Sequence, residues 1–231
     1  MATPSRSASS PSTSSTDGLP TGQLFVLKVG TSTIMGPTGP DMAGLAKLAD
    51  VLAALTAAGN RCVLVTSGAV GTGRWRLGLK RKPKSIPEKQ AAAAVGQGIL
   101  MALYEKLLAE RGLASAQILL TRDDLSNRHR YVNASNTLGV LLAVDPPVIP
   151  IINENDSVAI EELKFGDNDT LSALVASLVD ADRLFILSDV DGLYEADPRA
   201  KPDARRLVTV EAITPEIEAL AGGASDADAV A

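Results

Sequence analysis

The chain has 231 residues, a formal net charge of −5 and 45% hydrophobic residues, of which few are aromatic. This length requires only one domain, and a mildly acidic chain without a long basic run argues against nucleic acid as the main partner. The single cysteine, Cys62, excludes an intrachain disulfide and fits a reducing compartment. We therefore expect a cytoplasmic protein, with no apolar run long enough to span a membrane.

Residues 1–23 differ in composition from the rest of the chain. They are rich in Ser, Thr, Pro and Ala, and Arg6 is their only basic residue. Such a segment buries too little apolar surface to fold, so we expect a disordered tail. An organelle-targeting peptide is the alternative, although such peptides carry more arginine.

From residue 24 onward, strand-like and helix-like patterns alternate. We expect strands at 24–29, 61–66, 116–120, 148–152 and 183–187, and helices at 41–58, 88–111, 130–143 and 171–179. Strands separated by helices predict right-handed βαβ units and a mainly parallel sheet in an α/β fold. A core of Leu, Val, Ile and Ala, as this composition requires, is typical of such a sheet.

Two polar clusters flank apolar elements in the second half of the chain. Residues 153–157 (NENDS) end an apolar strand, and residues 164–169 (KFGDND) precede an apolar helix. Asp and Asn also cap helices and form turns, which is the structural alternative for each cluster. Acidic groups this close repel one another unless a cation or a ligand ammonium group lies among them. Because ligands of open α/β sheets bind at the carboxyl ends of strands, the clusters predict a pocket for a small charged molecule.

The other expected strands end in small or polar residues as well. The first runs through Lys28 into Gly30, the second into Ser67 and Gly68, and the last into Ser188 and Asp189. Each taken singly could be an ordinary turn or strand-end lysine. Together they indicate an anion site, because glycines let backbone N–H groups approach an anion and a lysine adds a point charge for phosphate.

Several common signatures are absent from the sequence. It has no G-x-x-x-x-G-K-[ST] motif, and Arg76 stands where a dinucleotide fingerprint beginning at Gly71 needs its third glycine. One cysteine and one histidine provide no zinc spacing. We expect Cys62 to be a buried structural residue and His129 to lie on the surface.

Four segments resemble those of the amino-acid kinase family, from about residue 24 to the C-terminus: residues 28–32 (KVGTS), 65–69 (VTSGA), 152–156 (INEND) and 166–169 (GDND). The last two are typical of the branch that phosphorylates the side-chain carboxylate of L-glutamate. The resemblance implies a three-layer αβα sandwich with a mainly parallel sheet. It also implies transfer of the γ-phosphoryl group of ATP, with Mg²⁺, to glutamate in the first step of proline biosynthesis.

The resemblance assigns roles to individual residues of this sequence. Lys28 would steady the transferring phosphoryl group, and Asp169 would organise the catalytic lysines rather than act as a base. The glutamate-binding positions would be Ser67, Asp156 and Asn168, with Gly68, Asn153 and Asp167 beside them. The nucleotide side would comprise Lys28, Gly30, Ser188 and Asp189. No residue is assigned as a metal ligand.

The sequence departs from the family pattern near its end. The family carries a Gly-Thr-Gly-Gly-Met segment followed by a second active-site lysine, whereas the last lysine here is Lys201. We therefore expect a kinase domain over residues 24–231 that is incomplete at its C-terminus and lacks an RNA-binding-like domain. The alternatives are a weakly active or inactive glutamate-binding domain and a sister kinase with another acceptor. The resemblance further implies a homo-oligomer, with proline as a candidate feedback inhibitor.

Overall fold

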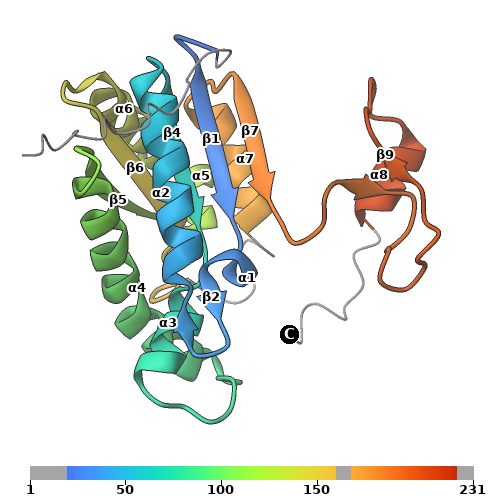
Figure 1. Cartoon of the computed structure of the whole chain (residues 1–231), viewed down its shortest axis with the longest axis horizontal. Helices are drawn as coiled ribbons and strands as arrows, with labels where there is room; N and C mark the ends of the chain where they lie inside the picture. Colours follow the sequence, from blue (N-terminus) through green and yellow to red (C-terminus); the bar gives the residue numbers. More distant parts are fainter. Residues whose placement is uncertain (1–19, 160–167, 223–231) are drawn as a thin grey trace, which may run out of the picture. The chain divides into compact units, whose positions relative to one another are not determined.

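The computed structural model describes residues 20–159 and 168–222 (Figure 1). This part of the chain divides after Leu187 into two compact units. The first unit contains a five-stranded sheet and its covering helices, and the second is a small unit of short elements.

All neighbouring strands in the five-stranded sheet are parallel. Their order is β5-β6-β4-β1-β7, formed by β1 (Leu24–Val29), β4 (Arg61–Thr66), β5 (Ala114–Leu120), β6 (Val148–Glu154) and β7 (Arg183–Leu187). Their carboxyl ends therefore lie along one edge, which confirms the predicted parallel sheet. In the register, Lys28 of β1 lies between Val65 of β4 and Ile186 of β7.

Helices cover both faces of this sheet, as the predicted three-layer architecture requires. One face packs against α2 (Met42–Ala57) and α4 (Ile86–Ala109), and the other against α6 (Arg128–Ala143) and α7 (Asn168–Leu178). Figure 1 shows α2 in front of the sheet and α7 behind it. Alternate residues of each strand point to opposite faces, so Leu27 joins the first core and Val26 the second.

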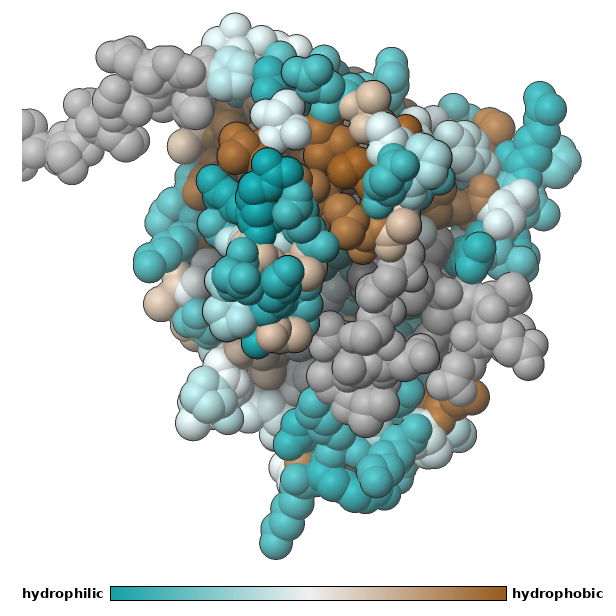
Figure 2. All heavy atoms as spheres, turned by 90° about the vertical axis from the view of Figure 1, so that its right-hand side faces the viewer, coloured by the Kyte–Doolittle hydropathy of each residue, from teal (hydrophilic) through white to brown (hydrophobic). Residues whose placement is uncertain are grey.

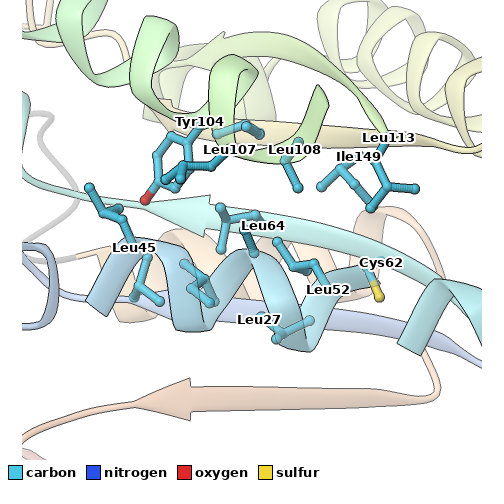
Figure 3. Packing of buried hydrophobic residues seen from close by; sticks show 14 of the residues in the cluster. Leu27, Leu45, Leu52, Cys62, Leu64, Tyr104, Leu107, Leu108, Leu113 and Ile149 are labelled. Carbon is cyan, nitrogen blue, oxygen red and sulfur yellow. The ribbon is translucent and has the colours of Figure 1, made fainter. Parts of the chain in front are cut away.

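The first core is built almost entirely from aliphatic side chains (Figure 3). Leu52 of α2 and Leu108 of α4 approach Leu64 of the central strand from the same face, and all three are fully buried. Cys62 is buried there as expected, and burial raises the pKa of its thiol to about 12. Tyr104 is the polar exception: its hydroxyl lies 2.8 Å from Oγ1 of Thr66, and burial raises its pKa.

Several short elements were not predicted from the sequence. They are α1 (Thr31–Ile34), α3 (Ala69–Arg76), α5 (Arg122–Ser126) and the hairpin of β2 (Met35–Gly36) with β3 (Gly39–Pro40). The sequence of α3 contains Gly71 and Gly73, which oppose helix formation, so its helix depends on tertiary packing. The predicted helix at 88–111 begins earlier, at Ile86, where Ser85 and Glu88 form a capping box.

Helix α4 has the length and composition of a membrane-spanning helix. The expectation that no apolar run is long enough to span a membrane was therefore wrong as judged by length and composition. In the structure, α4 packs on the sheet through Leu100, Tyr104 and Leu108, all of which are buried in the first core. Its apolar composition is thus explained by core packing.

Strand β7 forms one edge of the sheet and leaves apolar side chains exposed. Phe185, Ile186 and Leu187 are 46%, 49% and 36% exposed. Together with Phe25 and Val51 they line a groove of about 680 Å³. Figure 2, which views the side on which β7 lies in Figure 1, shows an apolar area at the surface.

The second unit contains an antiparallel strand pair and one helix. These are β8 (Leu193–Tyr194), β9 (Arg206–Leu207) and α8 (Pro215–Gly222), none of which was predicted. Arg206 donates to the carboxylate of Asp191 at 2.9 Å, and this contact supports the turn beside the pair.

Candidate active site

The carboxyl edge of the sheet brings together polar residues from three adjacent strands and one helix. Lys28 is the penultimate residue of β1, Ser67 follows β4, and Asn153 lies near the end of β6. The first turn of α7 adds Asn168 and Asp169. The sequence predicted all five as site residues, and the structure places them at the same edge.

Lys28 and Asp169 form an ion pair that joins β1 to α7. The whole Lys28 residue is only 8% exposed, whereas the carboxylate side chain of Asp169 is 42% exposed. A lysine this buried needs a nearby anion, because taking an ammonium group out of water costs several kcal/mol. The pair therefore fixes a cation beneath the surface of the site, with its counterion toward solvent.

Gly30 leaves space directly in front of this cation. A Cβ atom at Gly30 would lie 3.6 Å from Nζ of Lys28 and 3.8 Å from Oγ of Ser32. The backbone here can thus approach an anionic ligand without a side chain in the way. The phosphate-binding role of Lys28 and Gly30 would use this space, and it stays a prediction.

Asn168 connects α7 to two strands through one amide group. Its Nδ2 lies 2.5 Å from the carbonyl oxygen of Thr66, 2.8 Å from Oγ of Ser67 and 2.9 Å from Oδ1 of Asn153. Two N–H groups thus face three acceptors, so this end of the amide is fully engaged. Among the described residues no donor lies on Oδ1 of Asn168, so this oxygen can accept a hydrogen bond from a ligand.

Asn153 is almost fully buried and extends this network into α4. Its Oδ1 also accepts a hydrogen bond from the backbone N–H of Glu154, and its Nδ2 donates to Oε1 of Gln97, both at 2.9 Å. Asn153 is 2% exposed. Gln97 was not predicted as a site residue. The available signal was a glutamine between two glycines in the apolar middle stretch of the helix.

Two close contacts hold the turn after β4. Gly68 has φ of +94°, and a Cβ atom there would lie 2.5 Å from Cδ1 of Ile34. Helix α3, which begins after this turn, touches α4 backbone to backbone: a Cβ atom at Gly96 would lie 1.8 Å from the carbonyl oxygen of Ala69. Ser67 is thus positioned by packing that only glycine permits.

The other predicted residues lie in three different places along the chain. Asp156 is half-buried in the turn after β6, whose backbone is tied by the N–H of Asn155 to the carbonyl oxygen of Leu120 at 2.9 Å. Asp167 lies outside the described residues. Ser188 and Asp189 begin the second unit, where Asp189 pairs with Arg199. His129 is exposed, as expected.

Residues 20–159 and 168–222 contain no cluster of three or more His, Cys, Asp or Glu side chains that could hold a metal ion. The described residues therefore do not form a metal cage of their own. A magnesium ion bound mainly by the phosphates of a nucleotide needs no such cage.

Comparison with known proteins identifies the family. The model of the amino acid kinase family matches residues 23–229, and the chain belongs to this family. Within it, the chain is 58% identical over 201 residues to the glutamate 5-kinase of Moorella thermoacetica, covering 87% of this chain and 53% of the relative. It is 52% identical over 203 residues to that of Clostridium acetobutylicum, covering 87% and 74%.

A solved structure supports the fold alone. The isopentenyl phosphate kinase of T. acidophilum, in its product complex, matches with a TM-score of 0.53 at 20% identity, covering 78% of this chain and 76% of that one.

A further relative, the glutamate 5-kinase of Acaryochloris marina, is 58% identical over 192 residues, covering 82% of this chain and 51% of its own length. The chain thus spans about half the length of most of the curated relatives it matches.

Proposed function

We propose that the chain is a kinase domain that transfers the γ-phosphoryl group of ATP to the side-chain carboxylate of L-glutamate. The product is L-glutamyl 5-phosphate, made in the first step of proline biosynthesis. The observation that carries the proposal is the ion pair of the buried Lys28 with Asp169, beside the amide network of Asn168, Asn153 and Ser67. The names of the relatives, which are glutamate 5-kinases, support the same substrate.

The proposed chemistry needs alignment and charge neutralisation. A carboxylate oxygen of glutamate attacks the γ-phosphorus, the bond to the β–γ bridging oxygen breaks, and ADP leaves with the electron pair. A carboxylate is ionised at neutral pH, so no residue has to remove a proton from it. A fixed ammonium group such as that of Lys28 lowers the barrier by stabilising charge on the transferring phosphoryl oxygens.

Each site residue has a place in this scheme. Asp169 orients Lys28 and is a positioning residue, since its carboxylate pairs with the lysine. The oxygen of Asn168, the hydroxyl of Ser67 and the carboxylate of Asp156 offer acceptors for the substrate's ammonium group. The assignments of Asp167 to glutamate and of Ser188 and Asp189 to the nucleotide stay predictions.

The proposal includes the partners that this reaction implies. Mg²⁺ would arrive with ATP and be held chiefly by phosphate oxygens, where it supplies charge neutralisation. Feedback inhibition by proline, a homo-oligomeric state and a cytoplasmic location belong to the proposal as well.

The test is an acceptor panel assayed with the 231-residue chain. ADP release and trapping of the acyl phosphate as a hydroxamate would be measured with glutamate, aspartate, acetylglutamate and carbamate. We expect turnover with glutamate, a loss of about 10²–10³-fold in Lys28→Met, and no loss in Lys47→Met, a matched change at an exposed lysine. Turnover with another acceptor in place of glutamate, or equal activity of the two variants, would overturn the proposal.

A further inference from the structure

Gln97 lies on α4 and reaches the amide network from the helix side. Its Oε1 accepts a hydrogen bond from Nδ2 of Asn153 at 2.9 Å. Asn153 in turn accepts from Nδ2 of Asn168, also at 2.9 Å. Gln97 is therefore linked by two hydrogen bonds to Asn168, which is proposed to contact the substrate. Gln97 itself lies on α4 and not among the polar residues at the strand ends.

The hydrogen bonds determine which way each amide points. Oδ1 of Asn153 must face the N–H groups of Glu154 and Asn168, so its Nδ2 must face Gln97. Gln97 must then present Oε1 to this donor and turn its own Nε2 away. Nε2 of Gln97 is buried and has no hydrogen-bond partner within the described chain.

This arrangement is hard to explain by packing alone. A buried N–H group without a partner destabilises the folded state, and an apolar side chain of the same shape would avoid that cost. The acceptor oxygen of Gln97 is the only part of its amide that a described residue uses. What the glutamine provides is thus a buried acceptor for Nδ2 of Asn153, which stabilises the amide orientation that Glu154 and Asn168 require.

We propose that Gln97 is a positioning residue for the amino-acid substrate, acting through Asn153 on Asn168; this inference rests on the proposed function. With Asn153 held by Gln97, its oxygen receives Nδ2 of Asn168, and the oxygen of Asn168 is left to accept from the substrate's ammonium group. Without Gln97, Asn153 loses the acceptor for its Nδ2. Loss of this bond lowers the free-energy difference between the present amide orientation and the turned one, in which Asn153 would present a donor to the donor of Asn168 and the amide of Asn168 would have to turn as well.

The test compares two variants at this position. Gln97→Met keeps the length of the side chain and removes the acceptor, whereas Gln97→Glu keeps an acceptor oxygen. Gln90→Met is the matched control, because Gln90 lies two turns earlier on the same face of α4 and its Nε2 donates to the carbonyl oxygen of Ala159 at 3.4 Å, not to Asn153 or Asn168. Thermal unfolding of all three would be measured beside the kinetics.

We expect Gln97→Met to raise KM for glutamate by about tenfold, the effect of one lost hydrogen bond, with KM for ATP within about twofold of the parent. Gln97→Glu should restore KM for glutamate, and Gln90→Met should leave both constants unchanged. Equal increases of the two KM values in Gln97→Met, or equal effects of Met and Glu, would overturn the inference in favour of a structural role.

A second readout separates this inference from the proposed function. The side-chain amide NMR resonances of Asn153 and Asn168 report their hydrogen bonding without turnover. They should shift in Gln97→Met and stay near the parent positions in Gln97→Glu and Gln90→Met. If the parent chain does not phosphorylate glutamate, the proposed function fails while this shift still supports the positioning of Asn168. Unchanged Asn168 resonances in Gln97→Met overturn the inference whatever the activity.

Discussion

The same substitution at two glycines of α4 should have opposite effects on stability. A Cβ atom at Gly96 would lie 1.8 Å from the carbonyl oxygen of Ala69 and 2.5 Å from the backbone nitrogen of Gly73, whereas one at Gly98 would meet nothing within 4 Å. Ordinary van der Waals contact begins at 3.4 Å, so Gly96→Ala must push α3 and α4 apart by about 1.6 Å. Backbone atoms cannot rotate aside as a flexible side chain can.

The expected magnitudes follow from these contacts. Replacing glycine by alanine inside a helix gains about 0.5–1 kcal/mol, which Gly98→Ala should show in full. Gly96→Ala gains the same amount but also carries an overpacking cost of about 1–3 kcal/mol or more. Urea unfolding followed by circular dichroism should therefore give a higher midpoint than the parent for Gly98→Ala and a lower one for Gly96→Ala.

The displaced helix also affects the site. Because α3 follows Ser67 and Gly68 directly, Gly96→Ala should raise KM for glutamate, while Gly98→Ala should leave it unchanged. The reasoning would be refuted by a Gly96→Ala protein as stable as Gly98→Ala, since the two helices would then not touch at this crossing.

Three further predictions concern single residues. Gly68→Ala should lower the free energy of unfolding by more than about 1 kcal/mol, because φ is +94° and the methyl group would meet Ile34; urea unfolding measures it, and an unchanged midpoint would contradict the geometry. Asp156→Ala should weaken glutamate binding while leaving ATP binding largely intact in calorimetry, and equal loss of both would mean that the residue is structural. The raised pKa of Cys62, about 12, keeps its thiol protonated in the native state. Alkylation of native protein should therefore stay slow between about pH 7 and 10, whereas the urea-unfolded chain, with a thiol pKa near its ordinary value of about 8.5, should react faster as the pH rises through that window. A native rate that rises equally would show that the thiol is accessible.

The sequence was sufficient to predict the sheet and the residues at its carboxyl edge. Strands such as Arg61–Thr66 are short apolar runs between turn residues, so the residues next to each strand determine where it begins and ends. The association of Asp169 with Lys28 was implied by the family resemblance, and the ion pair between them is present. Lys28 lies near the carboxyl end of β1 and Asp169 in the first turn of α7. These features depend on local pattern and on general rules of βαβ connection.

Other features could not be predicted because they depend on contacts between distant segments. Helix α3 contains two glycines in its own sequence, and what favours its helix is the close crossing with α4, which needs Gly73 of α3 and Gly96 of α4. In the sequence Gln97 is a polar residue in the apolar middle stretch of α4, and only the structure shows that Asn153 donates to its Oε1. A glutamine on a helix gives no sequence signal of a partner 56 residues away.

The first turn of α7 is tied to three adjacent strands by side chains. Asp169 pairs with Lys28 of β1, and Asn168 donates toward the end of β4 and to Asn153 of β6. The residue proposed to hold the phosphoryl group and the residue proposed to hold the acceptor thus meet through two consecutive positions of one helix. Phosphoryl transfer requires the attacking oxygen and the phosphorus to be held a few ångströms apart and in line. The proposed reaction would use this anchored helix turn, because Lys28 and Asn168 are linked through it and neither can shift without moving the other.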